Sequence, residues 1–527
     1  MAAMLLAVGI PVVAVLSRSF IPTVGLEMAG GSPWGRILGA GRTWRIIGIT
    51  VAQAFGSTAA TVLIGVPIAY VLTRFSFTGR GLLRTAVTVP FVLPSVVLGA
   101  AFSAVAGSRG LFDARGSWAL IIAAHVCFNL AVVIRSVGSA FGRSGGDSEA
   151  AARMLGRTRS GAFFSVALPQ VIPAVLASAV IVFLFCLTSF GIVVMLGGGS
   201  VTTIEVEIWT RATRQFDLGG AAVLGMVQFL AVLATLGLDS VLGGRNRPVR
   251  QGEVAPSRLP SGVGERLAIA LSSLAIIMIA IVPLGALVLR SLQIPGGIGL
   301  DNWTSMGSVL AGTGMGTTPV HAIANSLSTA AVVTALTVLL AVPTSRYLAG
   351  LPGQRAKSLV LAPLGVSATT MGLGLLIAFG SGPFDIRGSG WLVPIAQLLV
   401  ALPLVTRVLV APVESIDPSV LDAASLLGAD PRNRFWRVEL PTLLPALVAG
   451  AGLGFVVCLG EFGATVFVAR SGSVTMPVLL QQLMSRPGGA GYGQAMALAV
   501  VMVLFCGAVL AVTDRLGGRF TGDLTIA

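Results

Sequence analysis

The chain has 527 residues, of which 55% are hydrophobic and only 10% are charged, whereas a soluble globular domain carries about 25% charged residues. This composition excludes an ordinary soluble domain and predicts an all-α polytopic membrane protein embedded in a lipid bilayer. The formal net charge of +14 does not indicate a nucleic-acid partner, because basic residues in membrane proteins concentrate in cytoplasmic loops.

Apolar, charge-free runs predict about twelve transmembrane helices, six in each half of the chain, since ~20 apolar residues span a bilayer as a helix. In chain order they cover residues 1–17, 48–72, 86–107, 117–134, 166–190, 218–238, 267–289, 322–345, 358–379, 390–406, 442–466 and 490–513. The first run lacks a basic segment before it and is followed by further spans. We therefore interpret it as a span and not as a cleaved signal peptide.

The basic residues predict the orientation of these spans. If the N-terminus is cytoplasmic, the inside loops hold 22 of the 34 Lys and Arg residues. Such an excess marks the cytoplasmic side of a membrane protein. We expect both termini to be cytoplasmic in a multi-pass protein of the plasma (inner) membrane.

One polar, Arg-bearing segment occurs twice between long apolar runs. Residues 150–169 read AAARMLGRTRSGAFFSVALP and residues 422–441 read DAASLLGADPRNRFWRVELP, an offset of 272 residues. Arg135 and Arg407 are separated by the same offset. Because six spans return the chain to its starting side, the two halves are predicted to be a parallel repeat related by an axis along the membrane normal.

The duplicated segment resembles the EAA loop of type I ABC-importer permeases. In that family Glu-Ala-Ala, a Gly and a Leu-Pro thirteen residues after the Gly mark a coupling helix that docks on an ATPase subunit. Two sets of residues here match the motif, and each keeps the step from Gly to Pro. They are Glu149, Ala151, Ala152, Gly156 and Pro169 in the first copy and Asp422, Ala423, Ala424, Gly428 and Pro441 in the second.

The acidic position of the motif differs between the copies. The second copy has Asp422 there, whereas the first has Ala150, with Glu149 one residue earlier. We expect Pro169 and Pro441 to end each coupling helix before the following span, because proline interrupts helices.

A wider resemblance is to fused two-domain permeases of thiamine and ferric-iron importers. It is carried by HVCFNLAVVIR, LTSFGIVVMLGGG, TTIEVEIWTRA, GEFGATVFVAR, MPVLLQQLMSRPGG and YGQAMALAVV, over about residues 44–241 and 321–514. The resemblance implies alternating access driven by two ABC ATPase subunits, with an extracytoplasmic substrate-binding protein delivering the substrate. It leaves thiamine, ferric iron and other substrates open.

This resemblance also defines six segments of the chain. They are 1–43, the first transmembrane helix and outer loop; 44–241, the first permease domain; 242–266, a cytoplasmic linker; 267–320, the seventh transmembrane helix and outer loop; 321–514, the second permease domain; and 515–527, a cytoplasmic tail.

The chain offers no catalytic constellation. A phosphate-binding loop needs a Gly before its Lys, and the only Lys stands in Ala356-Lys357-Ser358. We therefore expect no enzyme activity and no cofactor in this chain, with ATP bound by the partner subunit. His125 is interpreted as a polar residue bonded between helices, and the four Cys residues as core residues without metal.

Glu461 is the one clear acid inside a predicted span, where an ionised carboxylate is costly unless it is paired or faces water. It is either a pathway residue facing the interface between the halves or the partner in a structural hydrogen bond near the outer interface. Ser189 occupies the equivalent position of the first half, so the two form the candidate pathway positions.

Two other classes of function compete with the importer permease. A gradient-driven secondary transporter would be expected to carry carboxylates in several spans, yet Glu461 alone stands out. A membrane scaffold would not need two matched coupling loops. The twelve spans and the parallel repeat do not separate these classes, so the coupling loops decide between them.

Overall fold

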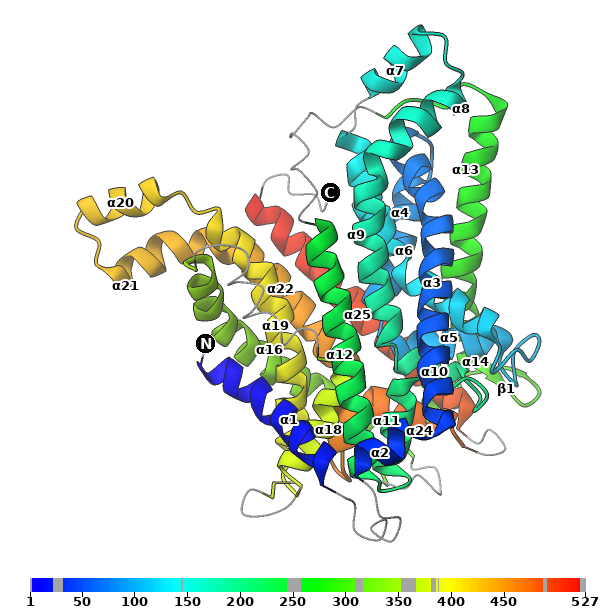
Figure 1. The fold of residues 1–527 in the computed structure, drawn as a ribbon, viewed down its shortest axis with the longest axis vertical. Helices are drawn as coiled ribbons and strands as arrows, with labels where there is room; N and C mark the ends of the chain where they lie inside the picture. The colour runs from blue at the N-terminus through cyan, green and yellow to red at the C-terminus, as the bar shows by residue number, and fades with distance from the viewer. Residues whose placement is uncertain are drawn as a thin grey trace. The chain divides into compact units, whose positions relative to one another are not determined.

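The computed structural model describes residues 2–21, 32–143, 146–243, 257–308, 316–351, 366–380, 385–386, 388–486 and 491–521 (Figure 1). Within them the only strands are β1 Gln293–Ile294 and β2 Gly297–Ile298, which pair antiparallel. All other regular elements are helices, which confirms the predicted all-α class. Residues 244–256 of the predicted linker and 522–527 of the predicted tail lie outside the described residues.

Nine helical stretches in the described part of the chain are long and apolar enough to cross a membrane. Each coincides with a predicted span. They are formed by α3 Gly41–Arg74, α6 Trp118–Arg143, η2 Phe163–Ala167 with α9 Leu168–Leu187, α12 Leu218–Gly243, α13 Val263–Ile276 with η3 Ile277–Ile281 and α14 Val282–Leu292, α16 Pro319–Ala349, α19 Leu392–Glu414, α21 Pro431–Arg434 with η7 Phe435–Glu439 and α22 Leu440–Gly460, and α25 Tyr492–Thr521.

The predicted span at 86–107 is a bent pair of helices. Helix α4, Arg80–Val92, and helix α5, Ser95–Ala106, meet at an angle of 113°. The cause lies at Pro94, which has no N–H to continue the first helix. The preceding Leu93 has φ −71° and ψ 146°, the extended conformation that a following proline favours.

Apolar helices also lie in the two remaining predicted spans. Helix α1, Ala2–Phe20, covers the predicted span 1–17, and helix α18, Ala368–Ala378, covers the end of the span predicted at 358–379. The start of that span, up to residue 365, lies outside the described residues. The shorter helices are α2 Pro33–Leu38, α7 Gly146–Met154, α8 Arg159–Ala162, α10 Gly191–Leu196, α11 Ile204–Thr213, α15 Asp301–Thr304, η4 Ser305–Gly307, α20 Pro418–Leu426, α23 Thr465–Val468 and α24 Met476–Met484.

The helices pack into two compact units that do not coincide with the predicted domains. Unit 1 contains residues 1–35, 208–226 and 291–527, and unit 2 contains residues 36–207 and 227–290. The segment 208–226 belongs to unit 1 although the repeat assigns it to the first half. The reason is its packing: a Cβ added at Gly225 would lie 3.4 Å from Thr370 and 3.5 Å from Val15, both in unit 1.

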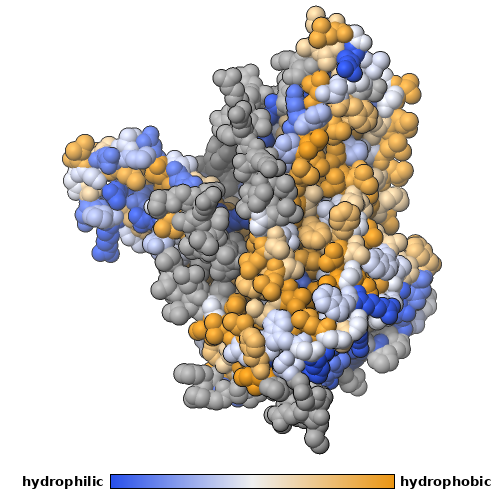
Figure 2. Space-filling model, viewed as in Figure 1, coloured by the Kyte–Doolittle hydropathy of each residue, from blue (hydrophilic) through white to orange (hydrophobic). Residues whose placement is uncertain are grey.

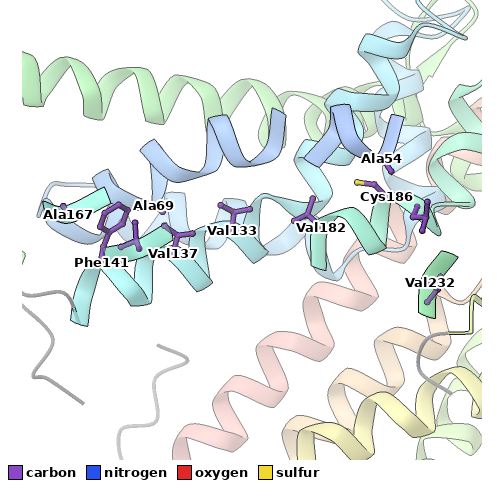
Figure 3. Close-up of a cluster of buried hydrophobic side chains, with 11 residues drawn as sticks. Ala54, Ala69, Val133, Val137, Phe141, Ala167, Val182, Cys186 and Val232 are labelled. Atoms are coloured by element: carbon purple, nitrogen blue, oxygen red, sulfur yellow. The ribbon is translucent and has the colours of Figure 1, made fainter. Parts of the chain in front are cut away.

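The core of unit 2 is an apolar cluster shared by α3, α6, α9 and α12. Its buried residues include Ala69, Val133 and Phe141 (Figure 3). A Cβ added at Gly65 would lie 2.7 Å from the Val133 side chain. The backbones of α3 and α6 therefore approach closely, as small residues allow between helices in lipid.

The core of unit 1 is built in the same way by α16, α19 and α22. Its buried residues include Val405 and Leu447. Gly450 and Gly454 face α19, where an added Cβ would lie 3.3 and 3.2 Å from Val405. These two glycines, at the ends of the sequence GAGLG, therefore let the helices approach.

The outer surfaces of α9 and α13 are apolar. Leu176, Leu271 and Leu274 are about half exposed there, and Figure 2 shows hydrophobic side chains over these helices. A water-soluble protein rarely exposes so large an apolar surface, whereas lipid tails solvate it without cost.

Candidate functional site

The two copies of the duplicated segment fold into the same order of elements. The first loop consists of α7, α8 and η2 and leads into α9; the second loop consists of α20, α21 and η7 and leads into α22. Each element of the second loop begins and ends 272 residues after its counterpart. In Figure 1, α20 and α21 extend beyond the ends of α19 and α22 in unit 1, as α7 and α8 do beyond α6 and α9 in unit 2.

A glycine ends the first helix of each loop. Gly156 has φ +88° and Gly428 has φ +84°, a left-handed conformation that glycine adopts without strain. The next N–H group closes the helix end, from Arg157 to the carbonyl of Ala152 at 3.1 Å and from Ala429 to that of Ala424 at 3.0 Å. The Ala and Gly positions of the motif are therefore positions of a shared helix cap.

Each glycine follows a pair of exposed apolar side chains. Met154 and Leu155 are 89% and 87% exposed, and Leu426 and Leu427 are 90% and 88% exposed. Covering such adjacent apolar groups with another surface is favourable, because it removes apolar area from water. The sequence reasoning did not select these four residues, although the recurrence of Leu-Gly in both copies was a signal for them.

The acidic residues of the two loops differ in their environments. Asp422 lies on the exposed surface of α20. Glu149 on α7 is instead turned into unit 2, where its Oε1 lies 2.7 Å from Nη2 of Arg74 at the end of α3. The carboxylate that departs from the motif position thus already has a partner within the chain.

The expectation that Pro169 and Pro441 end the coupling helices is wrong. Each proline lies in the first turn of the following helix, and the π-helical segments η2 and η7 carry the helix through it. The N–H of Leu168 donates to the carbonyl of Phe163, and that of Leu440 to Phe435. These are the i→i−5 hydrogen bonds of a π-turn, and they keep the chain helical up to the proline, which has no N–H of its own to donate. The breaks in the chain lie at Gly156 and Gly428.

Polar side chains cap the short helices of the loops. Thr158 Oγ1 accepts the N–H of Gly161 at 3.1 Å, and its counterpart Asp430 accepts the N–H of Asn433 at 2.7 Å. Asp417 Oδ1 accepts the N–H of Ser419 at the start of α20. Hydrogen bonds from the backbone and the side chain of Ser419 hold the pKa of the Asp417 carboxyl below its ordinary value. N-terminal caps of this kind stabilise short helices.

The candidate pathway residues lie at breaks in equivalent helices. Glu461 follows α22 and is buried, and its carboxylate accepts the N–H groups of Ala464 at 2.7 Å and Thr465 at 2.9 Å. Ser189 follows α9, and its Oγ lies 2.8 Å from Nε2 of His125. One residue therefore caps a short helix in unit 1 and the other joins a side-chain network in unit 2.

His125 is bonded between helices, as its position in the sequence suggests. Its Nδ1 lies 3.0 Å from the hydroxyl of Ser57 on α3. Two amides that the sequence reasoning missed hold the end of α9 nearby: Gln53 donates to the carbonyl of Cys186 and Gln228 to that of Leu187. A helix that ends in lipid needs such donors for its last carbonyl groups.

Comparison with known proteins agrees with this architecture. Residues 61–245 and 356–521 each match the family described as binding-protein-dependent transport system inner membrane component. The chain is 26% identical to a thiamine transport system permease protein of Salmonella typhimurium, covering 93% of this chain and 92% of that protein. It is 24% identical to a probable ABC transporter permease protein of Sinorhizobium fredii, covering 90% of this chain and 87% of that protein.

A partial similarity has a different substrate in its name. Over 155 residues the chain is 31% identical to a putative 2-aminoethylphosphonate transport system permease protein of Salmonella paratyphi A, covering 29% of this chain and 58% of that protein. The two family matches lie on the two repeats and together cover more than half of the chain. The protein therefore belongs to the family of binding-protein-dependent transport system inner membrane components, as a multi-pass permease in the fused form that carries the family domain twice.

Proposed function

We propose that this permease is the transmembrane subunit of an ATP-driven importer and that its first and second loops dock on two separate ABC ATPase subunits. The supporting observation is the pair of exposed apolar residues that precedes the left-handed glycine in both loops. A surface repeated at equivalent positions fits a partner that is itself present twice. We place both loops and both termini on the cytoplasmic side, because this orientation puts most of the Lys and Arg residues in cytoplasmic loops.

The helical path through each loop suits a mechanical role. An ATPase that pulls on α7 or α20 would transmit the motion through Gly156 or Gly428 to the next helix. That helix continues through η2 or η7 into a membrane span. Because that helix has no break at the proline, little motion would be lost between the loop and the membrane. Closure of the ATPase subunits on ATP would then drive alternating access.

The substrate is proposed to be a cation, thiamine or ferric iron, delivered by an extracytoplasmic binding protein. The full-length relative from Salmonella typhimurium is named for thiamine transport, and a buried carboxylate at Glu461 would favour a positive charge. Glu461 and Ser189 are proposed to lie on the substrate pathway. This chain would bind no cofactor of its own, and ATP would be bound by the partner.

Reconstitution into proteoliposomes tests this function. The chain is expected to copurify with two ATPase subunits and to hydrolyse no ATP when purified alone. With ATPase and binding protein present, uptake of labelled thiamine or ferric iron should require ATP. Uptake driven by an ion gradient without any ATPase would instead establish the alternative, a secondary transporter, and ATP hydrolysis by the chain alone would also contradict the proposal.

A further inference from the structure

Two arginines at equivalent positions of the repeat reach toward the loop of their own half. Arg74 ends α3, and Arg346 lies 272 residues later in the last turn of α16. We propose that they are positioning residues that brace the two coupling loops at opposite ends. Arg74 braces the first loop at its docking helix, whereas Arg346 braces the second loop where it returns to the membrane. The consequence for coupling rests on the proposed function, but the bracing itself does not.

The contact in the first loop is made to the docking helix itself. Arg74 Nη2 lies 2.7 Å from Glu149 Oε1, and the two side chains are only 12% and 19% exposed. A charged pair with so little water around it is screened less than a surface pair. Glu149 precedes the exposed Met154 by five residues on the same helix. The pair therefore sets the direction in which α7 presents its apolar end.

The contact in the second loop is made at its far end. Arg346 Nη2 lies 3.0 Å from Glu439 Oε2, and the guanidinium lies over the ring of Phe435 at 5.1 Å from its centroid. Arg434 Nε approaches the same carboxylate at 3.5 Å. Glu439 is the last residue of η7 and its side chain is 5% exposed. These contacts fix the π-helical turn that leads into α22 and leave α20 to its own caps.

Neither acid has an acidic counterpart in the other half. Leu421 stands at the position equivalent to Glu149, and Ala167 stands at the position equivalent to Glu439. The two arginines therefore stand at equivalent positions of the repeat, whereas their acidic partners lie at opposite ends of the two loops. The difference between the loops is therefore built into the sequence and does not depend on how a side chain happens to be turned.

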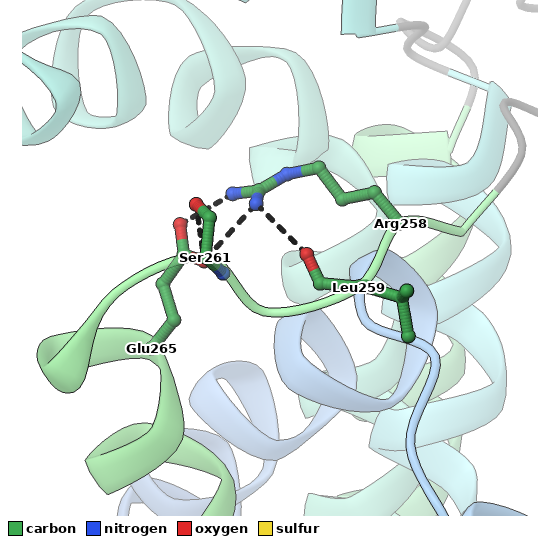
Figure 4. Close-up of polar contacts among 4 residues, drawn as sticks. All are labelled: Arg258, Leu259, Ser261 and Glu265. Atoms are coloured by element: carbon green, nitrogen blue, oxygen red, sulfur yellow. Dashed lines mark hydrogen bonds and ion pairs between the residues drawn. The ribbon is translucent and has the colours of Figure 1, made fainter.

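The end of the linker supports the brace on the first loop. The N–H of Arg258 donates to the carbonyl of Arg74 at 3.0 Å, and the N–H of Ser76 donates to the carbonyl of Arg258 at 2.9 Å. The guanidinium of Arg258 is bound by Glu265, with Nη1 at 3.0 Å from Oε2 (Figure 4). The guanidinium of Arg258 is therefore paired with Glu265, and Arg74 is the partner of Glu149. The brace on α7 is in this way joined to the segment that connects the two halves.

Spin labels on the full-length chain in lipid nanodiscs test the proposal. A label at Met154→Cys or Leu426→Cys reports the mobility of α7 or α20, since the four native cysteines are all buried. Arg74→Gln should increase the mobility of the label at position 154 and leave that at 426 unchanged. Arg346→Gln should increase the mobility of a label at Trp436→Cys and leave those at 154 and 426 unchanged. Arg115→Gln, which removes an exposed ion pair with Asp113, should change none of them.

The charge swap Arg74→Glu with Glu149→Arg should restore the restricted spectrum at position 154. An unchanged spectrum in Arg74→Gln, or equal mobility gains at 154 and 426, would overturn the proposal. These spectra are recorded without any ATPase, so they are independent of the proposed function. Adding the ATPase subunits tests that function separately: with Arg74 and Arg346 left in place it should restrict the labels at 154 and 426, and in the unlabelled chain Arg74→Gln should lower substrate-stimulated ATP hydrolysis several-fold without loss of the complex.

Discussion

Glu461 and Thr465 bond each other at two points. The carboxylate of Glu461 accepts the N–H of Thr465 at 2.9 Å, and the hydroxyl of Thr465 donates to the carbonyl of Glu461 at 2.9 Å. With the further bond from the N–H of Ala464, this carboxylate satisfies two backbone donors where α22 has ended. The same group can therefore serve the fold and, as proposed, the passage of a cation.

The substitution Glu461→Gln separates these two roles. A glutamine amide cannot replace both acceptor oxygens, so we expect a loss of about 1–3 kcal/mol in folding stability from one unsatisfied buried donor. Transport of a cationic substrate per folded protein should also fall, while assembly with the ATPase is unchanged. Thermal melting and uptake measured on the same preparation check this. Normal uptake per folded protein would leave Glu461 with only its structural role.

The double substitution Leu426→Gln with Leu427→Gln should weaken ATPase binding. Both side chains are close to 90% exposed, so stability should change by less than about 0.5 kcal/mol. Each truncated interface anchor costs about 1–2 kcal/mol of binding, which is about tenfold in affinity. Affinity for the ATPase is measured in nanodiscs, and Met154→Gln with Leu155→Gln should act similarly. Leu111→Gln, at a leucine that is 80% exposed but outside both loops, serves as the control; a matching loss there would contradict the docking assignment.

Proline in place of the left-handed glycines should uncouple transport, and more strongly in the second loop. Gly428 and Gly156 have φ +84° and +88°, whereas proline requires φ near about −65°. Both substitutions should deform the loop, but only the second loop has an exposed acid at the motif position, Asp422. Substrate-stimulated ATP hydrolysis is the readout. Gly199→Pro, at φ +81° in a loop elsewhere, is the matched control, and equal losses from the two loop variants would show that the loops contribute symmetrically.

The start of α20 should loosen in acid. The bonds from Ser419 lower the pKa of Asp417, so the cap's contribution is fully present above the ordinary carboxyl pKa of about 4. It is lost as the pH falls through the lower pKa of the folded state, because the protonated group accepts these bonds less well. Hydrogen exchange at the amides of residues 419–421 should thus be constant from neutral pH to about pH 5, once corrected for intrinsic rates, and less protected at pH 3. Asp417→Asn should remove this pH dependence, and a dependence that persists in the variant would assign it to another group.

The class of this protein and the location of its loops could be predicted from local features of the sequence. Long apolar runs can be satisfied in only one way in lipid, as helices that bond their own backbone. The repeat aligned Gly156 with Gly428 in sequence. A helix end that needs a left-handed residue favours glycine whatever surrounds it. The prediction was weaker at Pro94 and Pro169, where the outcome depends on how the freed carbonyl groups are accommodated. One proline bends the chain by 113°, whereas a π-turn carries the helix through the other.

Only the tertiary structure decided which residues form the ion pairs of the loops. Nothing near Arg74 in the sequence indicates that its carboxylate is Glu149, or that the equivalent Arg346 takes Glu439 at the other end of its loop. The burial of Glu461 against two backbone donors depends equally on where α22 ends. Hydropathy and spacing report the environment of a residue along one helix, whereas an ion pair depends on distances between segments far apart in the chain. Apolar periodicity and turn residues therefore determined the helices and the loops, and packing determined which charges hold the loops in place.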